Sequence, residues 1–580
     1  PPAGPAAPAA PAAVNAATPP VAHDAAPARA PAATAKPGGA EPGPAVGGTL
    51  ATAAQRGIWL LENSPGGRAV SNAPLVFEYD GTLDRARLAR CVTHWLACHP
   101  ILRSTYAWED GGLRIRERET APFVLASVDL RAEPEAQRLA SAEALIAAEA
   151  MRPFDLRHDP MLRVTELRLG ERAGRLIFVF HHIAVDDRAM NVLFAELERH
   201  YRAGDAPLAA DGTPTRRFAD FAAQTRGAEA AAADLGYWVE QLRDYRGATA
   251  YLVEPEAKPA TRFAGRLHRH LLPAATSRDF EAAAARRAVT PFALFATAVT
   301  TLVRHGAGTD DVTIGSFFSQ RDHFADSELV GFFVNTLPLR VRSGADWDLD
   351  RLAQAVSLTL AEAQTHRHVA TEDIFDALQA STALRRAAFR VMVNLEPEQA
   401  EMLEMDGFTA RRVPLDRGVA KYDLLFSLRK EEDGYRVLVE YHTGLYDEAI
   451  IARICANLDR VLAALTGEAR VALAELALPD PRDEAAWQAA GGAAAPLDFR
   501  ALVREIWAGE VGRGDFGDGE NFFDVGGSSL KIMSVYEKLS RRLGERGFDK
   551  ELDIVALFEH VTVGSLAAFL EEWTAHDALA

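Results

Sequence analysis

Two histidines and two aspartates stand within one short segment of the chain. The segment His181-His182-Ile183-Ala184-Val185-Asp186-Asp187 directly follows the apolar run Leu176–Phe180, which the pattern predicts to be a buried strand. A histidine at the end of such a strand can face a channel, where its imidazole can exchange a proton near neutral pH. A nearby aspartate can then serve in a structural ion pair. Taken alone, a pair of histidines also fits an ordinary core or surface position.

A second chemically distinctive segment lies near the C-terminus. It reads Asn521-Phe522-Phe523-Asp524-Val525-Gly526-Gly527-Ser528-Ser529-Leu530 and precedes a stretch with helical apolar spacing. Two glycines allow a sharp turn into a helix. A serine at a helix N-terminus is exposed, and the free N–H groups and the helix dipole there favour a phosphodiester. The alternative is an ordinary serine N-cap.

This second segment resembles the phosphopantetheine attachment site of peptidyl carrier proteins, in which a Phe-Phe pair precedes Gly-Gly, a variable residue, Ser and an apolar residue. The resemblance covers about 80 residues of this chain and includes the expected four helices. It implies a covalent 4'-phosphopantetheine on Ser529, because Ser528 occupies the variable position and Leu530 follows.

The histidine segment resembles the His-His-x-x-x-Asp-Gly motif of nonribosomal peptide synthetase condensation domains, which is shared by the wider chloramphenicol-acetyltransferase-like fold. Further segments match that family in the expected order across residues 49–478. They are Ala53–Trp59, His99–Tyr106, Phe218–Ala222 with Tyr237-Trp238, Ile314–Ser316 and Gly331–Thr336.

The resemblance implies an α/β fold of two chloramphenicol-acetyltransferase-like halves in a V shape with a tunnel between them, plus a small all-α four-helix carrier domain. It implies an acyltransferase in which His182 acts as general base or orients the nucleophile. His181 and Asp186 belong to the motif, and Asp186 is expected to be ion-paired. Arg103 is the first expected partner of Asp186, and Arg163 is the second.

Two departures from the family pattern concern the acceptor substrate. Asp187 replaces the motif glycine and adds charge and bulk, so it either selects the acceptor or only caps a local turn. A later His-x-x-x-Pro-Phe-Glu-like segment reads Ala370–Asp376 here and lacks its proline.

The expected reaction joins a carrier-bound acyl thioester to an amine or hydroxyl, forming an amide or an ester. The expected partners are an upstream donor carrier, a phosphopantetheinyl transferase, and a downstream module or release enzyme. No Gly/Ser/Thr/Lys-rich nucleotide-binding loop is visible in the sequence. We therefore expect an adenylation or other loading enzyme, either as a separate protein or in segments of a longer parent protein. The alternatives are a catalytically inactive recruitment platform and an epimerisation-type domain, although the latter follows its carrier in the family architecture.

Composition divides the chain into four parts. Residues 1–48 are rich in Ala and Pro and predict a flexible linker. Residues 49–478 form the expected condensation domain, with halves at about 49–222 and 223–478, and a second linker spans 479–496. The carrier domain is expected over 497–575, with helices at about 497–511, 528–543 and 563–573 and a turn near 554–558. Because the chain begins Pro-Pro-Ala, we expect it to be part of a longer protein.

The overall composition argues against several classes of protein. The chain has 580 residues and a net charge of −18, which argues against general nucleic-acid binding. Three cysteines indicate a reducing cytoplasm rather than a disulfide scaffold, and the absence of a long uncharged apolar stretch predicts no membrane span. Cys91, His94, Cys98 and His99 have spacings close to those of metal ligands, but helix packing explains them, and we expect no metal.

Overall fold

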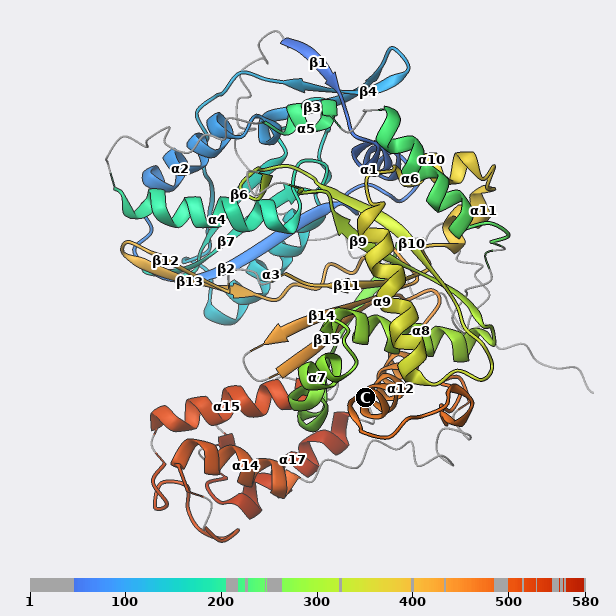
Figure 1. Ribbon diagram of the computed structural model, residues 1–580. Coiled ribbons are helices and arrows are strands. Elements are labelled where there is room, and N and C mark those ends of the chain that lie inside the picture. The colour runs from blue at the N-terminus through green and yellow to red at the C-terminus, as the bar shows by residue number, and fades with distance from the viewer. Residues whose placement is uncertain are drawn as a thin grey trace, which may run out of the picture. The chain divides into compact units, whose positions relative to one another are not determined.

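The structure is a computed structural model, and it describes most of the chain after residue 45. The described residues are 46–204, 217–224, 228–245, 247, 263–322, 326–397, 401–431, 434–483, 499–513, 516–527, 529–544, 552, 556–557 and 560–577. Within them, strands form three sheets, accompanied by helices in a mixed α/β arrangement (Figure 1).

The first large sheet carries the histidine segment. Its strand order is β12-β13-β2-β7-β6-β5, with bounds Met402–Met405, Phe408–Val413, Asn72–Gly81, Ala173–His181, Leu162–Arg168 and Ala126–Asp129. Strand β7 is central and pairs with β2 in an antiparallel register that places Leu75 opposite Phe178. All five residues of the apolar run Leu176–Phe180 are buried, as expected of a strand covered on both faces. The strand predicted at 176–180 is therefore confirmed.

Helices α1 (Ala53–Glu62), α2 (Arg85–Cys98), α3 (Glu135–Met151) and α4 (Asp187–Arg202) accompany this sheet. Helix α2 has Asp84 as its N-cap. Its apolar residues share one face and are buried in the core of the first sheet: Leu88, Val92, Trp95 and Leu96. The helical spacing of these residues thus fixes the side on which α2 packs.

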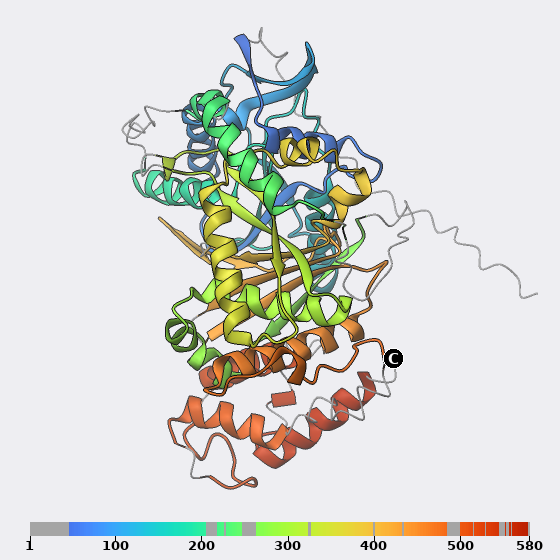
Figure 2. The same cartoon turned by 45° about the vertical axis from the view of Figure 1, so that its right-hand side comes forward.

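The second large sheet has the order β10-β9-β11-β14-β15-β8. The bounds are Val334–Arg342, Asp311–Ser319, Val391–Leu395, Leu424–Glu431, Gly434–His442 and Gly265–Leu271. Helices α7 (Ala274–Arg286), α8 (Pro291–Ala307), α9 (Leu349–Thr365) and α12 (Glu448–Thr466) contact one another and lie against this sheet (Figure 2). Their apolar faces and the sheet form a second core.

A small sheet and several short helices complete the part before the carrier. The small sheet has the order β1-β4-β3, with bounds Val46–Leu50, Gly112–Glu117 and Ser104–Glu109. The short helices are α5 (Phe218–Gln224), α6 (Ala228–Gln241), α10 (Thr371–Ala377) and α11 (Thr382–Ala387), with 3-10 turns at Pro100–Arg103 and Leu473–Glu475.

Strands β12 and β13 do not follow the expected division at residues 222 and 223. By sequence they belong to the second half, yet β13 pairs antiparallel with β2 and extends the first sheet. Leu403, Phe408 and Ala410 are buried in the core of that sheet. The second half of the chain therefore supplies two strands to the first sheet, because their apolar faces complete its core.

The two expected linkers lie mostly outside the described residues. Residues 1–45 of the first are not described, whereas Val46–Gly48 already belong to β1, and Val46 pairs with Glu117. In the second, 484–496 are not described. The preceding residues 479–483 are described, and the Asn457 side-chain amide donates to the carbonyl of Pro479 at 2.9 Å. The described contacts therefore begin before residue 49 and continue past residue 478.

The C-terminal region is all helical in its described part, with α14 (Phe499–Val511), α15 (Ser529–Gly544) and α17 (Val563–Asp577). These agree with the predicted helices to within a few residues. In the turn predicted near 554–558, only Ala556 and Leu557 are described, and both are helical. Trp507, Phe522 and Leu539 are among the buried residues of its separate core.

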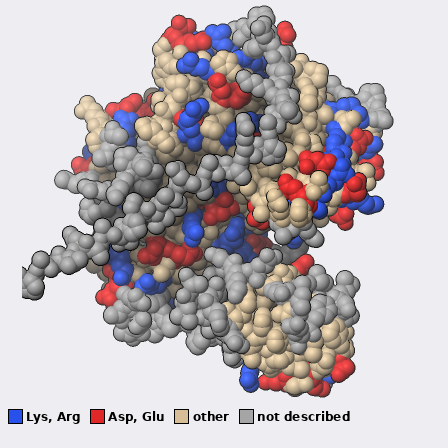
Figure 3. Space-filling model, turned by 180° about the vertical axis from the view of Figure 1, so that it is seen from behind, with Lys and Arg blue, Asp and Glu red and all other residues tan. Residues whose placement is uncertain are grey.

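Acidic and basic side chains are interspersed over the described part of the face seen in Figure 3. The surface charge there is thus mixed in sign rather than uniformly basic, in keeping with the negative net charge of the chain.

Candidate active site

His182 begins a short loop between β7, which ends at His181, and α4, which starts at Asp187. Two buried side chains hold this loop. The Gln55 amide donates to the carbonyl of Ile183 at 2.8 Å, and the Tyr106 hydroxyl donates to the same carbonyl at 3.3 Å. The backbone N–H of His182 donates to the carbonyl of Ser71 at 2.9 Å. The first two residues of the loop, His182 and Ile183, are therefore anchored by three hydrogen bonds.

The His182 imidazole is held by a contact within its own loop. Its Nδ1 lies 3.2 Å from the carbonyl of Val185. Since a carbonyl only accepts, Nδ1 carries the hydrogen, and in the neutral ring Nε2 keeps its lone pair. Burial holds the pKa of His182 well below its ordinary value of 6.5, and the positive charges of Lys421 and Arg417 lower this pKa further. His182 is therefore neutral at neutral pH.

His181 has a structural environment. Its side chain is fully buried, and Nδ1 accepts the backbone N–H of Ile183 at 3.2 Å. Nε2 lies 3.6 Å from Glu62, whose carboxylate also accepts the backbone N–H groups of Ala69 and Ser71. Burial lowers the pKa of His181, and Glu62 opposes this shift. The two neighbouring histidines thus differ in kind, because one is enclosed and the other is partly exposed.

Asp186 closes the loop and connects the two halves of the chain. It is the N-cap of α4, and its Oδ1 accepts the backbone N–H of Ala189 at 2.8 Å. Arg321 donates to both carboxylate oxygens, at 2.8 and 3.1 Å, and the backbone N–H of Phe333 donates to Oδ2 at 3.1 Å. The Asp186 carboxylate therefore accepts four hydrogen bonds from three donor groups.

The prediction that Asp186 pairs with Arg103 or Arg163 is wrong. Arg103 is the last residue of the 3-10 turn after α2, and it donates to the backbone carbonyls of Leu96 and Arg118. Arg163 lies on β6, where its guanidinium stacks 3.7 Å over the ring of Phe154. The ion pair itself exists, but Arg321 supplies it from a distant part of the sequence.

A segment from the second half covers the histidine loop. Gly331 accepts the backbone N–H of Asp186 at 3.1 Å, and the ring of Phe332 lies 6.5 Å from that of His182 in an edge-to-face arrangement. A Cβ at Gly331 would lie 2.2 Å from the buried ring of Phe218. A glycine at position 331 therefore lets the segment Gly331–Thr336 approach the Phe218 ring closely.

Asp187 is the first residue of α4 and is partly exposed. Burial raises its pKa to about 6, and the neighbouring Asp186 charge contributes in the same direction. The helix cap is made by Asp186 rather than Asp187. The backbone of Asp187 does not adopt a positive φ, so this position makes no conformational demand for the family's glycine.

Sequence reasoning missed two cations beside the loop. Arg417 donates to the carbonyl of Asn72 at 2.6 Å, and its guanidinium lies 3.7 Å from Glu440. Burial lowers the pKa of Lys421 to about 8, with Arg417 adding to the effect. Both residues lie between β13 and β14 outside any motif. Only the long-range fold brings them near His182.

The second departure from the family pattern, at Ala370–Asp376, largely coincides with helix α10. The Thr371 hydroxyl there contacts the side-chain amide oxygen of Asn335 at 3.2 Å. Asn335 in turn donates to the carbonyls of Arg367 and Val369. The segment therefore packs against the start of β10 without the family's proline.

Two other features are separate from the histidine loop. A cavity of about 230 Å³ is bordered by residues that include His99, Ser104, Arg217 and Leu329, and none of the segment 181–187. On α2, Cys91 is buried, and the Cys98 sulfur lies 3.3 Å from Nε2 of His94. His99 contacts Glu196 at 2.8 Å. The His94–Cys98 contact lies within α2, whereas the His99–Glu196 contact joins the end of α2 to α4.

The turn before α15 is sharp and closely packed. Gly526 has a φ of +113°, which favours glycine, and a Cβ at Gly527 would lie 2.3 Å from the ring of Phe522. The N–H of Gly527 donates to the carbonyl of Phe522 at 2.8 Å. Ser529 then opens α15, whereas Ser528 lies outside the described residues. The residues present thus fit a phosphodiester at a helix start.

Two family models match this chain. The family model described as "Condensation domain" matches residues 47–487, and the one described as "Phosphopantetheine attachment site" matches residues 501–570. The chain therefore belongs to the condensation-domain family and continues into a carrier domain of the type that bears covalent 4'-phosphopantetheine.

The relatives are nonribosomal peptide synthetases. A linear gramicidin synthase of Brevibacillus parabrevis is 29% identical over 461 residues, which are 76% of this chain and 6% of that protein. A phosphinothricin tripeptide synthetase of Streptomyces viridochromogenes is 28% identical over 74% of this chain and 36% of its own length. The chain spans between 6% and 38% of the length of these and similar curated relatives.

Solved structures share the fold. The X-domain from teicoplanin biosynthesis superposes with a TM-score of 0.65 at 23% identity, covering 74% of this chain and 97% of that one. The first condensation domain of the calcium-dependent antibiotic synthetase, in complex with a substrate analogue, gives 0.62 at 20% identity, covering 75% and 100%. The predicted chloramphenicol-acetyltransferase-like fold is confirmed. None of the helices in the described ranges combines the length and apolar character that a membrane span requires.

Proposed function

We propose that this chain joins an acyl group, delivered as a thioester on an upstream carrier, to an amine or hydroxyl held on its own carrier domain. The observation that carries the proposal is the state of His182, whose Nδ1 is held by Val185 and whose pKa is lowered. A neutral imidazole with a free Nε2 lone pair is the form that a general base requires.

The proposed step balances within the two substrates and one histidine. The nucleophile forms a bond to the thioester carbonyl carbon while His182 Nε2 accepts its proton. The carbon–sulfur bond breaks, and the departing thiolate takes up the proton, which restores neutral His182. Lys421 and Arg417 assist indirectly, because their charges keep the resting imidazole unprotonated. Positioning two tethered reactants removes much of the entropic cost of their encounter.

Ser529 is the proposed attachment residue for the phosphopantetheine arm, which supplies a thiol that holds an acyl group as a thioester. The N–H groups at the start of α15 would hold the phosphodiester. Gly526 and Gly527 shape the turn that presents it. The product then stays on this carrier until a downstream module or release enzyme removes it.

The proposed partners follow from this chemistry. A phosphopantetheinyl transferase modifies Ser529, an adenylation or other loading enzyme supplies the acceptor, and an upstream carrier delivers the donor. The deciding experiment is intact mass spectrometry of the carrier after incubation with candidate donor and acceptor thioesters. A mass gain equal to the donor acyl group supports the proposal.

A recruitment platform without catalytic activity is the second candidate, and Asp187 is the observation that favours it. Its carboxylate stands one residue beyond the motif Asp186, where the family has glycine. A platform would bind a tailoring enzyme and give no product with any loaded carrier, even after Asp187→Gly. In an active enzyme, the same substitution tests acceptor choice: a ranking of competing acceptors that shifts toward ordinary α-amino acids identifies Asp187 as a specificity residue.

A further inference from the structure

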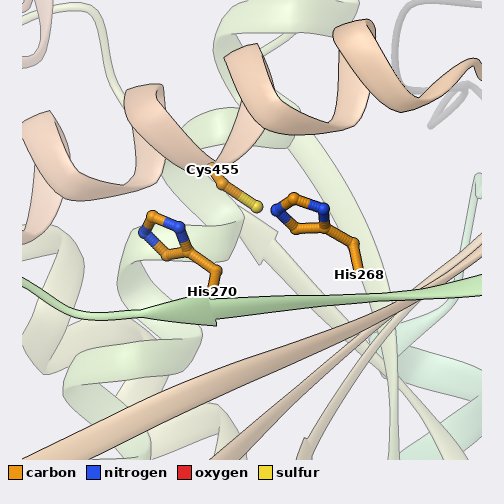
Figure 4. Close-up of side chains that lie close together, drawn as sticks. All are labelled: His268, His270 and Cys455. Carbon is orange, nitrogen blue, oxygen red and sulfur yellow. The ribbon is translucent and has the colours of Figure 1, made fainter. Parts of the chain in front are cut away.

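Two histidines and a cysteine meet on the far edge of the second sheet, outside the histidine loop. His268 and His270 lie two residues apart on the edge strand β8 and therefore point to the same face. Cys455 lies on α12, which packs over that strand. One nitrogen of each ring and the Cys455 sulfur all lie within 4.8 Å of one another. Figure 4 shows both rings flanking the sulfur.

The outer nitrogen of each histidine contacts a carboxylate on the same helix. His268 Nδ1 lies 2.7 Å from Glu448, and His270 Nε2 lies 2.8 Å from Asp459. The Tyr441 hydroxyl also donates to Glu448. Glu448, Cys455 and Asp459 recur at intervals of seven and four residues, so one face of α12 carries all three. Each carboxylate is thus held in place to orient one ring.

These contacts set the tautomers of both rings. A carboxylate accepts, so Nδ1 of His268 and Nε2 of His270 carry the hydrogens. In the neutral rings, Nε2 of His268 and Nδ1 of His270 then present lone pairs toward Cys455. A single S–H can satisfy only one of these lone pairs. A cation satisfies both lone pairs and a thiolate together.

We propose that His268, His270 and Cys455 form a binding site for a divalent metal ion, with Glu448 and Asp459 orienting the two histidines. The imidazole and thiolate donors select zinc over magnesium or calcium, which prefer oxygen ligands. In zinc sites, a histidine ligand commonly donates its other ring N–H to a carboxylate, which fixes the orientation of the ring. A water molecule completes the tetrahedron.

The consequence is a cross-link between an edge strand and a helix. Among the described strands, β8 pairs with β15 alone, and a metal ion would tie it to α12 in addition. The His268 and His270 side chains are 12% and 16% exposed, so an ion can reach them from solvent. None of these residues belongs to the His182 site, so the metal has a structural role that is independent of acyl transfer.

The test uses the full chain without an affinity tag, stripped with a chelator and titrated with zinc. We expect about one zinc per chain by elemental analysis and a higher melting temperature with zinc than without. Cobalt in place of zinc should produce the charge-transfer absorption of a cobalt–thiolate bond. Asp459→Asn should weaken zinc affinity about 10- to 100-fold, because it alters only the orienting partner.

Cys455→Ala should abolish the charge-transfer absorption. Cys98→Ala is the matched control, because it removes the other cysteine that contacts a histidine and should leave zinc binding unchanged. If Cys455→Ala does not fold, the zinc content and the cobalt spectrum of the unmodified chain still decide. Less than about one zinc per ten chains at saturation, or a cobalt complex without thiolate absorption, overturns the proposal.

Discussion

The carboxylate of Asp186 and the guanidinium of Arg321 form two hydrogen bonds, at 2.8 and 3.1 Å, across 135 residues of sequence. Their side chains are 6% and 8% exposed. Arg321 also donates to the carbonyls of Asp326 and Leu329 and stacks 4.0 Å over the ring of Phe333. The residue that caps α4 beside His182 is therefore also the residue that joins the first half to the second.

Removing either partner of this pair should destabilise the protein. Asp186→Ala leaves Arg321 as a buried charge without its carboxylate, and Arg321→Ala leaves Asp186 in the converse state. We expect each to lower the free energy of unfolding by about 3–5 kcal/mol, measured by urea denaturation. Arg188→Ala is the control, because its pair with Glu328 is exposed and contributes about 0–1 kcal/mol. A fully stable but inactive Asp186→Ala protein would instead indicate a direct chemical role.

His182→Ala should reduce product formation by about 10²-fold or more, the contribution of a general base. Its melting temperature should stay near that of the unmodified protein, because the side chain is partly exposed. In the unmodified protein, the rate should remain level as the pH falls to 6.5 and decline only below it, since the pKa of His182 lies well under that value. Condensation at an undiminished rate in the variant would remove His182 from the mechanism.

Lys421→Met should move the acid limb of the pH–rate profile to higher pH. The ammonium group disfavours the imidazolium form of His182, so removing its charge raises the pKa of the histidine. Lys421→Arg keeps the charge and should leave the limb in place. If both variants move it equally, the contribution of Lys421 is steric rather than electrostatic.

Asp187→Asn should stabilise the protein above about pH 6. In the folded state the pKa of Asp187 is about 6, against an ordinary value of 3.8, so the folded protein holds a proton that the unfolded chain has lost. Stability therefore falls as the pH rises between these two values and stays lower above them. The gain is at most about 3 kcal/mol and should vanish near pH 4. Equal free energies of unfolding for Asp187→Asn and the unmodified protein at pH 8 would contradict this prediction.

Ser529→Ala should abolish attachment of the arm by a phosphopantetheinyl transferase with coenzyme A, whereas Ser528→Ala should still be modified. Ser529 opens α15 directly after the turn at Gly526 and Gly527. Intact mass measures the result. A mass gain on Ser529→Ala would show that the register of the motif is wrong.

Local patterns predicted the parts of the fold that local interactions determine. The apolar run Leu176–Phe180 predicted a buried strand, because the burial of contiguous apolar side chains is directly visible in a sequence. The segment 181–187 was recognisable because its residues are adjacent in the chain.

Contacts between residues that are far apart in the chain could not be predicted from local sequence patterns. Nothing in the sequence distinguishes Arg321 from Arg103 as the partner of Asp186, since either guanidinium could satisfy a carboxylate. Lys421 affects His182 only through the fold. His268 and Cys455 come together because an edge strand and a later helix pack against each other. Their spacing of almost two hundred residues matches no metal-ligand motif.

The pairing of β13 with β2 has a consequence for synthesis on the ribosome. Strand β2 is made early, but its neighbour Phe408–Val413 is made after most of the second sheet. Until then, β2 presents an open hydrogen-bonding edge, which is prone to pair with another chain. This edge of β2 therefore stays unpaired until the ribosome has synthesised Val413. Chaperone demand and aggregation during translation should peak in that interval.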